Sequence, residues 1–275
     1  MLRIGRHVSI SGSLDMAFDR ARSAGCDTMQ VFTGNPRQWS MGRLNDSAIE
    51  SFTGKREGYG VEPVVAHMPY LPNLANQRDE IYGKSVASLA EQVERCNDLR
   101  IDYLVLHLGS RLSMGREKSI DRIAKAVDEQ AGLMKGMILL ENQAGQLNSM
   151  GSAMGELAEI RGRIGSRNVG YCIDTCHAFA AGYDIGREDV LHDIDAVLGI
   201  RNIKVLHIND SKFGINEHRD RHENIGKGHI GSAAFGTVLN HYAKTGMPAI
   251  LETECLNEAQ ERAEIELVRK LAAAR

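Results

Sequence analysis

The sequence has no long apolar run, no paired cysteine motif and no large excess of charge of either sign. No stretch approaches the roughly 18 consecutive apolar residues that a membrane helix requires. The five cysteines form no CxxC pair and are odd in number, which predicts reduced thiols packed mostly in a core. The net charge of −3 does not mark a nucleic-acid-binding protein, so any DNA-binding surface must come from a local arrangement of basic residues.

The first residues also lack the apolar region of a signal peptide, since they run directly into a strand-like segment at Ile4. With no membrane span and reduced cysteines, we expect a soluble, cytoplasmic protein. At 43% hydrophobic and 25% charged residues, the composition is that of a globular protein. The length suits one large α/β domain or two small ones.

A repeating pattern decides between these options: a short β-branched apolar run, a polar loop, then an amphipathic helical stretch. The predicted strands are Ile4–Ile10, Thr28–Thr33, Pro63–His67, Tyr103–Leu108, Met137–Asn142, Val169–Asp174, Ile203–Ile208 and Ala249–Glu252. The predicted helices are Leu14–Ala24, Asp46–Glu57, Gln77–Leu99, Ser119–Lys135, Ser152–Arg163, Arg187–Leu198, Ser232–Lys244 and Asn257–Ala274. Ser13, Asn45 and Ser152 are the expected N-caps.

Eight strands alternating with eight helices predict one (β/α)8 TIM barrel domain spanning residues 1–275. The strands are nearly continuous apolar runs, as parallel strands covered on both faces should be. A doubly wound open sheet is the rival fold, but it typically has a glycine-rich first turn. The segment Ser9–Ser13 after the first strand is no dinucleotide-binding fingerprint.

Six successive predicted strands carry a His, Asp or Glu at their last or second-to-last position. These residues are His67, His107, Glu141, Asp174, His207 and Glu252. In a barrel the C-terminal ends of the strands converge on one mouth, where barrel enzymes carry their chemistry. We therefore expect the six side chains to face a common cavity.

Three further residues join this set. His177 follows Asp174 by three positions, and Asp220 and His222 share one side of the chain if their loop is extended. Any one of the nine residues could be an ordinary core histidine, helix cap or ion-pair partner. Together and without counter-charge, however, they would cost several kcal/mol each to bury.

Divalent cations are the simplest way to neutralise such a group. A mixture of imidazoles and carboxylates suits zinc or manganese better than calcium. Nine ligands exceed the needs of one tetrahedral ion and fit two or three. Several neighbouring metals suit displacement at phosphorus, because they activate water and neutralise the attacking and leaving oxygens. The residues alone thus predict a multi-metal barrel hydrolase or isomerase.

Longer motifs add a resemblance to a known family. Tyr171–Asp184 (YCIDTCHAFAAGYD), His207–Lys212 (HINDSK) and Asp220–Gly228 (DRHENIGKG) are similar to signatures of the endonuclease IV family of apurinic/apyrimidinic endonucleases. So are Gly5–Ser9 (GRHVS) and Phe32–Trp39 (FTGNPRQW), and the resemblance covers essentially the whole chain.

The resemblance implies three zinc ions, with Mn²⁺ as an alternative at one position. His67, His107 and Glu141 would hold the first ion. Glu141, the implied catalytic residue, would bridge to a second ion held by Asp174, His207 and Glu252. His177, Asp220 and His222 would hold the third.

The resemblance also implies a substrate and a reaction. Double-stranded DNA would be cut 5′ to abasic sites, leaving a 3′-hydroxyl and a 5′-deoxyribose phosphate, and 3′-blocking groups would be removed. Arg37, Tyr70 and Leu71 match residues that enter the duplex at the lesion, from loops at the C-terminal face of the barrel. The family resemblance further suggests a monomer.

Two alternatives remain open at this stage. Sugar isomerases and epimerases on similar barrels also place carboxylates and histidines at strand ends. They have no evident need for the cluster of His177, Asp220 and His222. A catalytically silent protein that binds DNA lesions or metal is the second alternative, and the intact set of nine residues argues against it.

Overall fold

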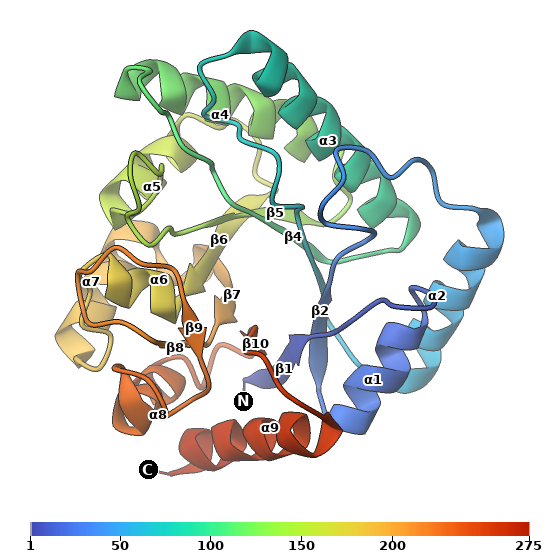
Figure 1. The fold of residues 1–275 in the computed structure, drawn as a ribbon, viewed down its shortest axis with the longest axis vertical. Helices are drawn as coiled ribbons and strands as arrows, with labels where there is room; N and C mark the ends of the chain where they lie inside the picture. Colours follow the sequence, from blue (N-terminus) through green and yellow to red (C-terminus); the bar gives the residue numbers. More distant parts are fainter. Residues whose placement is uncertain (1, 275) are drawn as a thin grey trace.

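Eight parallel strands close into a ring in the computed structural model, which describes residues 2–274 (Figure 1). The order around the ring is β1-β10-β7-β6-β5-β4-β3-β2, so each strand pairs with the next barrel strand along the chain and β10 closes on β1. The barrel strands are β1 (Arg3–His7), β2 (Thr28–Val31), β3 (Val64–His67), β4 (Tyr103–Leu106), β5 (Met137–Glu141), β6 (Val169–Asp174), β7 (Ile203–His207) and β10 (Pro248–Leu251). The predicted TIM barrel is confirmed.

Helices surround this ring on all sides in Figure 1. They are α1 (Met16–Ala24), α2 (Asp46–Tyr59), α3 (Asp79–Asp98), α4 (Arg116–Ala131), α5 (Met154–Gly162), α6 (Thr175–Ala180), α7 (Glu188–Leu198), α8 (Gly231–His241) and α9 (Glu258–Ala273). The predicted cap at Asn45 is confirmed, since its side chain accepts a hydrogen bond of 2.8 Å from the Ala48 amide. Such caps satisfy amides that the first helical turn leaves unpaired.

Two predicted N-caps are wrong. Helix α1 begins two residues later than expected, with Asp15 at its N-cap, and the Ser13 hydroxyl donates to the Asp15 carboxylate instead. Helix α5 has Ala153 at its N-cap, so Ser152 lies one residue before it. In both cases a serine just before a periodic apolar pattern indicated approximately where the helix begins. It did not indicate the N-cap residue itself.

Several short elements were not predicted. Helix α6 starts directly at the end of β6, because Asp174 caps it by accepting a 2.7 Å hydrogen bond from the His177 amide. A 3-10 turn, η1 (Ile200–Asn202), precedes β7. Two two-residue strands, β8 (Asp210–Ser211) and β9 (His222–Glu223), pair antiparallel in the long segment between β7 and α8. Segments of this length are too short to show a period in the sequence.

Two buried apolar clusters hold the layers together. The larger one lies between the strands and the helices and includes Phe18, Phe52 and Leu89. The smaller one fills the interior of the barrel with one residue from each of six strands: Val65, Val105, Leu139, Cys172, Val205 and Ile250. The barrel is thus a packed core rather than a pore.

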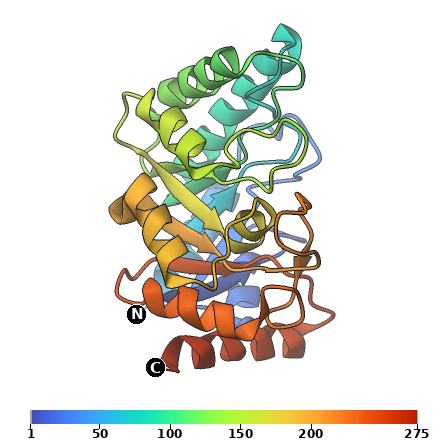
Figure 2. The ribbon, with the colours of Figure 1, turned by 90° about the vertical axis from the view of Figure 1, so that its left-hand side faces the viewer.

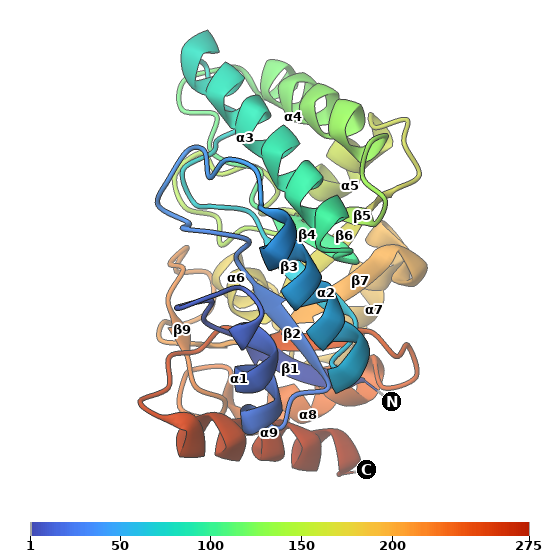
Figure 3. The ribbon, with the colours of Figure 1, turned by 90° about the vertical axis from the view of Figure 1, so that its right-hand side faces the viewer.

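The loops that follow the strands extend from one end of the barrel, and the segment carrying β8 and β9 is among them (Figure 2 and Figure 3). This end is the C-terminal face at which the sequence predicts the site. Among residues 2–274, no helix is long and apolar enough to cross a membrane.

Candidate metal centre

Six of the predicted residues come together because side chains alternate between the two faces of a strand. Each lies two positions after a member of the interior cluster, as His67 follows Val65 and Glu141 follows Leu139. Side chains two apart in a strand point to the same face, so all six point over the packed barrel interior. The set comprises His67, His107, Glu141, Asp174, His207 and Glu252.

Glu141 lies at the centre of this group, and only 1% of its side chain is exposed. Its Oε2 atom is 3.2 Å from Nε2 of His67 and 2.9 Å from Nε2 of His107. Its Oε1 atom is 2.8 Å from Nδ1 of His207. One carboxylate therefore faces imidazole nitrogens from three strands. Its Oε2 atom faces His67 and His107, and its Oε1 atom faces His207.

His207 connects Glu141 to two further carboxylates. Its Nδ1 atom is 3.2 Å from Glu252 Oε2 and 3.9 Å from Asp174 Oδ2. His207 and Asp174 are fully buried, while Glu252 has 16% of its side chain exposed. Three carboxylates around one imidazole nitrogen form an excess of negative charge that a cation would neutralise.

The remaining three residues form the cluster that distinguishes this site from a simpler one. His177 Nε2 is 3.2 Å from Asp220 Oδ1, and His222 Nε2 is 3.5 Å from the same oxygen. His222 Nε2 is also 3.5 Å from Asp174 Oδ2, yet it is buried and makes no hydrogen bond within the described residues. A buried imidazole nitrogen left without a partner is costly unless a ligand completes it.

The charged groups of the site shift the pKa values of their neighbours. Burial lowers the pKa of His177, but the carboxylates of Asp174 and Asp220 outweigh burial and hold it well above 6.5. Burial likewise raises the pKa of Glu252, but His207, His222 and His67 together outweigh burial, so that the pKa falls to about 2. Strongly shifted pKa values at a cavity are typical of functional sites.

Buried side-chain amides orient these groups, and the sequence prediction missed them. Gln30 on β2 places its Oε1 atom 2.8 Å from His207 Nε2 and donates to Glu252 Oε1 at 2.6 Å. Asn209 donates from Nδ2 to Asp174 Oδ2 at 2.7 Å and to Glu252 Oε2 at 3.2 Å. A glutamine inside the apolar run Thr28–Val31 was the signal that could have pointed to such a role.

Asp210 fixes the loop that carries Asp220 and His222. Its carboxylate accepts hydrogen bonds from the amides of Gly226, Gly228 and Ile230, at 2.9, 3.1 and 2.9 Å. A Cβ atom at Gly228 would lie 2.5 Å from Asp210 Oδ1, so only glycine allows this approach. The sequence motif His207–Lys212 includes Asp210, but it does not indicate this role.

The three predicted DNA-binding residues lie on the surface near the mouth. Tyr70 and Leu71 follow β3 with 65% and 40% of their surface exposed, and Tyr70 packs edge-on against Phe32 with ring centroids 5.4 Å apart. Arg37 is exposed in the loop after β2. Large apolar side chains held out in solvent beside a polar cavity are typical of binding surfaces.

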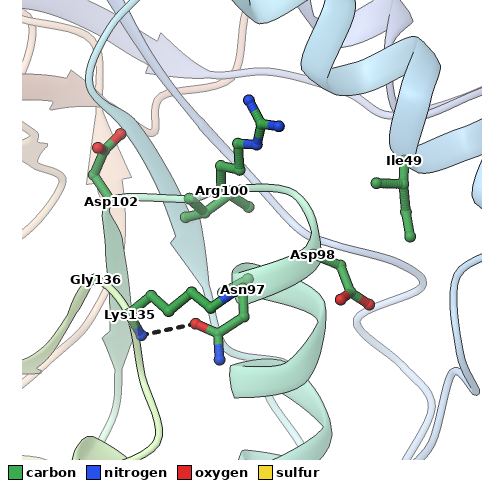
Figure 4. A pocket seen from close by; sticks show the side chains of 9 residues that line it. Ile49, Asn97, Asp98, Arg100, Asp102, Lys135 and Gly136 are labelled. Carbon is green, nitrogen blue, oxygen red and sulfur yellow. Dashed lines mark hydrogen bonds between the residues drawn. The ribbon is translucent and has the colours of Figure 1, made fainter.

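Six of the nine residues line an open cavity of about 990 Å³ at the barrel mouth, and Glu141, Asp174 and His207 are buried in contact with these six. His67, Tyr70, His107, His177 and Glu252 are among the residues that line it. Figure 4 shows a different cavity, which Asn97, Arg100, Asp102 and Lys135 line in the loops before β4 and β5. That cavity is at the opposite end of the barrel and contains none of the nine residues.

The five cysteines are free thiols, as predicted from the sequence. Two of them, Cys172 and Cys176, lie next to the ligand atoms of the site. Burial raises the pKa of Cys172 to about 12 and also raises that of Cys176. Cys172 belongs to the apolar cluster inside the barrel, and the Cys176 thiol donates to the Arg221 carbonyl at 3.7 Å, so both thiols pack in the protein interior.

Comparison with known proteins agrees with this architecture. Residues 18–271 match the family model described as a xylose isomerase-like TIM barrel. The solved structure of a D-tagatose 3-epimerase-like protein superposes with a TM-score of 0.77 over 99% of this chain and 98% of its own. At 20% identity that likeness shows the fold alone.

Other relatives are much nearer in sequence. Probable endonuclease 4 of Methanoculleus marisnigri is 44% identical over the full length of both chains. Probable endonuclease 4 of Cenarchaeum symbiosum is 41% identical over 98% of this chain and all of its own. The crystal structure of endonuclease IV from Thermus thermophilus is 32% identical, with a TM-score of 0.87 over 98% of this chain and 99% of its own. The chain therefore belongs to the endonuclease IV family of apurinic/apyrimidinic endonucleases.

Proposed function

We propose that this protein is a zinc-dependent endonuclease that hydrolyses the phosphodiester 5′ to abasic sites in double-stranded DNA. The products are a 3′-hydroxyl and a 5′-deoxyribose phosphate. The observation that carries the proposal is the convergence of nine imidazoles and carboxylates at the barrel mouth, six of them lining one cavity, in a chain whose full-length relatives are named probable endonuclease 4. Removal of 3′-blocking groups, which also requires hydrolysis of a phosphate ester, is part of the proposal.

The donor set fits three divalent ions. His67, His107 and Glu141 would hold the first, with Glu141 bridging to a second held by Asp174, His207 and Glu252. His177, Asp220 and His222 would hold the third. The unpaired Nε2 atom of His222 supports this assignment, because no described residue satisfies it. Imidazole and carboxylate donors are typical of zinc, with Mn²⁺ as an alternative at one position.

When bound, zinc supplies a Lewis acid and lowers the pKa of a coordinated water towards about 7. The protein supplies rigid ligands. The Oε1 atom of Gln30 accepts a hydrogen bond from His207 Nε2. The proton of His207 is then on Nε2, which leaves Nδ1 free to act as a ligand. Asn209 holds the carboxylates of Asp174 and Glu252 at fixed positions. Hydrogen bonds of this kind are the outer contacts that orient metal ligands in proteins.

The position of Glu141 explains why we assign it the catalytic role. Its two oxygens face different ligand groups, so it can hold both of the first two sites at a fixed spacing. The histidines around it lower its pKa well below 4.5 against the effect of burial. The surrounding imidazoles therefore favour the ionised form of Glu141, which is the form that binds metal.

The surface around the cavity fits a damaged duplex. Tyr70 and Leu71 project beside the mouth, where apolar wedges could fill the gap that a missing base leaves in the stack. An abasic nucleotide has no base to unstack, so its extrusion into the cavity is cheap. Lys212, Arg219 and Arg221 are exposed in the loop from β8 to β9 and could contact phosphates.

All nine ligands come from one chain, so a monomer suffices.

Incision of a duplex oligonucleotide that carries one tetrahydrofuran abasic analogue tests the proposal. We expect a single cut 5′ to the analogue that leaves a 3′-hydroxyl, and no cut in the matched undamaged duplex. The same preparation is assayed for conversion of ketoses and aldoses. Sugar turnover without strand scission would assign the barrel to the isomerases instead. Tight binding of abasic DNA without scission would indicate a silent lesion-binding protein.

A further inference from the structure

A second group of potential metal ligands lies outside the barrel mouth, on the outer surface of helices α7 and α8. His192 and Asp195 are one turn apart on α7, and His241 is the last residue of α8. Residues three apart on a helix share a face, and α7 packs beside α8 (Figure 1). One side-chain donor atom from each residue lies within 4.8 Å of the other two. We propose that this triad binds one divalent transition-metal ion, distinct from those at the barrel mouth.

The carboxylate of the triad is held in place from both sides. Asp195 Oδ2 lies 2.7 Å from His241 Nε2, and Asp195 Oδ1 accepts a 3.0 Å hydrogen bond from the Tyr242 hydroxyl. Tyr242 is buried, with 1% of its surface exposed. The phenol orients the carboxylate from one side, as outer contacts do in metal sites. Asp195 Oδ2 and His241 Nε2 share a hydrogen bond on the other side, and a cation bound by both atoms would take the place of the shared proton.

The two imidazoles supply the remaining donors. The rings of His192 and His241 lie edge to face with centroids 4.9 Å apart. His192 is exposed and its ring makes no hydrogen bond within residues 2–274, so nothing in that range competes for its ring nitrogens. Two protonated imidazoles this close would repel each other, whereas two neutral ones can share a cation. Two histidines and one carboxylate suit zinc, nickel or copper.

The partial exposure of the triad predicts an exchangeable site. His241 and Asp195 have 10% and 14% of their side chains exposed, and His192 faces solvent, which leaves room for water to complete the coordination. A bound ion would join the end of α8 to the middle of α7 and thereby stabilise the packing of two neighbouring barrel helices.

Calorimetric titration of zinc into protein already loaded at the barrel mouth tests the inference. We expect one further equivalent to bind to the wild type and none to His192→Ala, whose exposed position should leave the fold intact. His229→Ala removes another exposed histidine and should keep the extra equivalent. Tyr242→Phe should bind the ion about 10–100-fold more weakly. Absence of the further equivalent, or its full retention in His192→Ala, would overturn the proposal.

Electron paramagnetic resonance identifies the donors. One equivalent of Cu²⁺ added to the zinc-loaded protein should show hyperfine coupling to two imidazole nitrogens. This two-nitrogen signal should be absent from His192→Ala, which lacks one of the three donors. A spectrum that is identical in the two proteins would place the copper elsewhere and contradict the assignment.

Discussion

The side-chain amide of Gln30 lies between His207 and Glu252, with its oxygen 2.8 Å from His207 Nε2 and its nitrogen 2.6 Å from Glu252 Oε1. This contact determines which histidine nitrogen faces the metal site. Nε2 of His207 is directed at Gln30, and Nδ1 is directed at Glu141 and Glu252. A residue from β2, which contributes no predicted ligand, therefore orients His207, one of the side chains proposed to hold the second ion.

Replacement of Gln30 should weaken zinc at that position. Gln30→Leu removes both hydrogen bonds while keeping a similar volume, and we expect about 10–100-fold lower affinity for one of the three ions. Gln30→Glu should be worse, because it places a second carboxylate against Glu252 in a buried site. Competition with a zinc chelator, followed by metal analysis, measures the change. Unaltered affinity in both variants would mean that Gln30 only packs.

Glu141→Gln should abolish incision of abasic DNA and leave the fold largely intact. The substitution keeps the size of the side chain but removes the charge that faces three histidines. Zinc content should fall, since an amide is a poor bridging ligand. Strand scission is measured on the tetrahydrofuran duplex, with circular dichroism as the control for folding. Incision at the wild-type rate would refute the role assigned to Glu141.

Asp210→Ala should release the loop that carries Asp220 and His222. The carboxylate accepts hydrogen bonds from several loop amides, and these amides lose their partner in the variant. We expect loss of one zinc ion of three, while the ions held at the strand ends remain. Metal analysis of the purified variant measures this. Retention of all three ions would show that the loop is held by its other contacts.

Leu71→Ala should weaken binding to abasic DNA, because it removes an exposed apolar side chain beside the cavity. Leu133→Ala is the matched control, since Leu133 is 65% exposed in the connection between α4 and β5, at the other end of the barrel. Fluorescence anisotropy with abasic and intact duplexes measures both variants. We expect a loss of several-fold for Leu71→Ala on abasic DNA only. Equal effects of the two variants would remove Leu71 from the interface.

The metal-free protein should become less stable as the pH rises. The folded-state pKa of His177 lies well above 6.5, because Asp174 and Asp220 outweigh the effect of burial. A raised pKa contributes stability that is complete below about 6.5 and is lost as the pH rises through the folded-state value. The zinc-loaded protein should behave in the opposite way, losing stability below about 6.5 as protons compete with the metal for imidazole. Thermal melting of both forms from about pH 5 to pH 9 distinguishes the two slopes. Parallel slopes would contradict the assignment of His177 as a ligand.

Much of this architecture is readable in the sequence, for definite physical reasons. Parallel strands covered on both faces are apolar throughout, so a histidine or carboxylate where the run stops is conspicuous, as at His107 and Glu252. The closed barrel then brings these ends together whatever the details of the loops. The cluster of His177, Asp220 and His222 was accessible from spacing and from resemblance to the family.

The parts that were missed depend on tertiary contacts. Gln30 lies in an apolar strand, and nothing local shows that it faces two residues more than 170 positions away. Helix α6 begins inside the motif Asp174–His177, because one carboxylate both ends a strand and caps a helix. The N-caps predicted at Ser13 and Ser152 were wrong because several residues near the start of a helix can act as its N-cap, and the local sequence does not show which one does.

The central claim is that the nine side chains at the barrel mouth hold several divalent ions on which strand scission depends. Elemental analysis by mass spectrometry, on the same preparation that is assayed for incision, tests it most directly. We predict three zinc ions per chain, and loss of activity in step with their removal by a chelator. Full incision activity from protein that contains no bound metal would contradict the account.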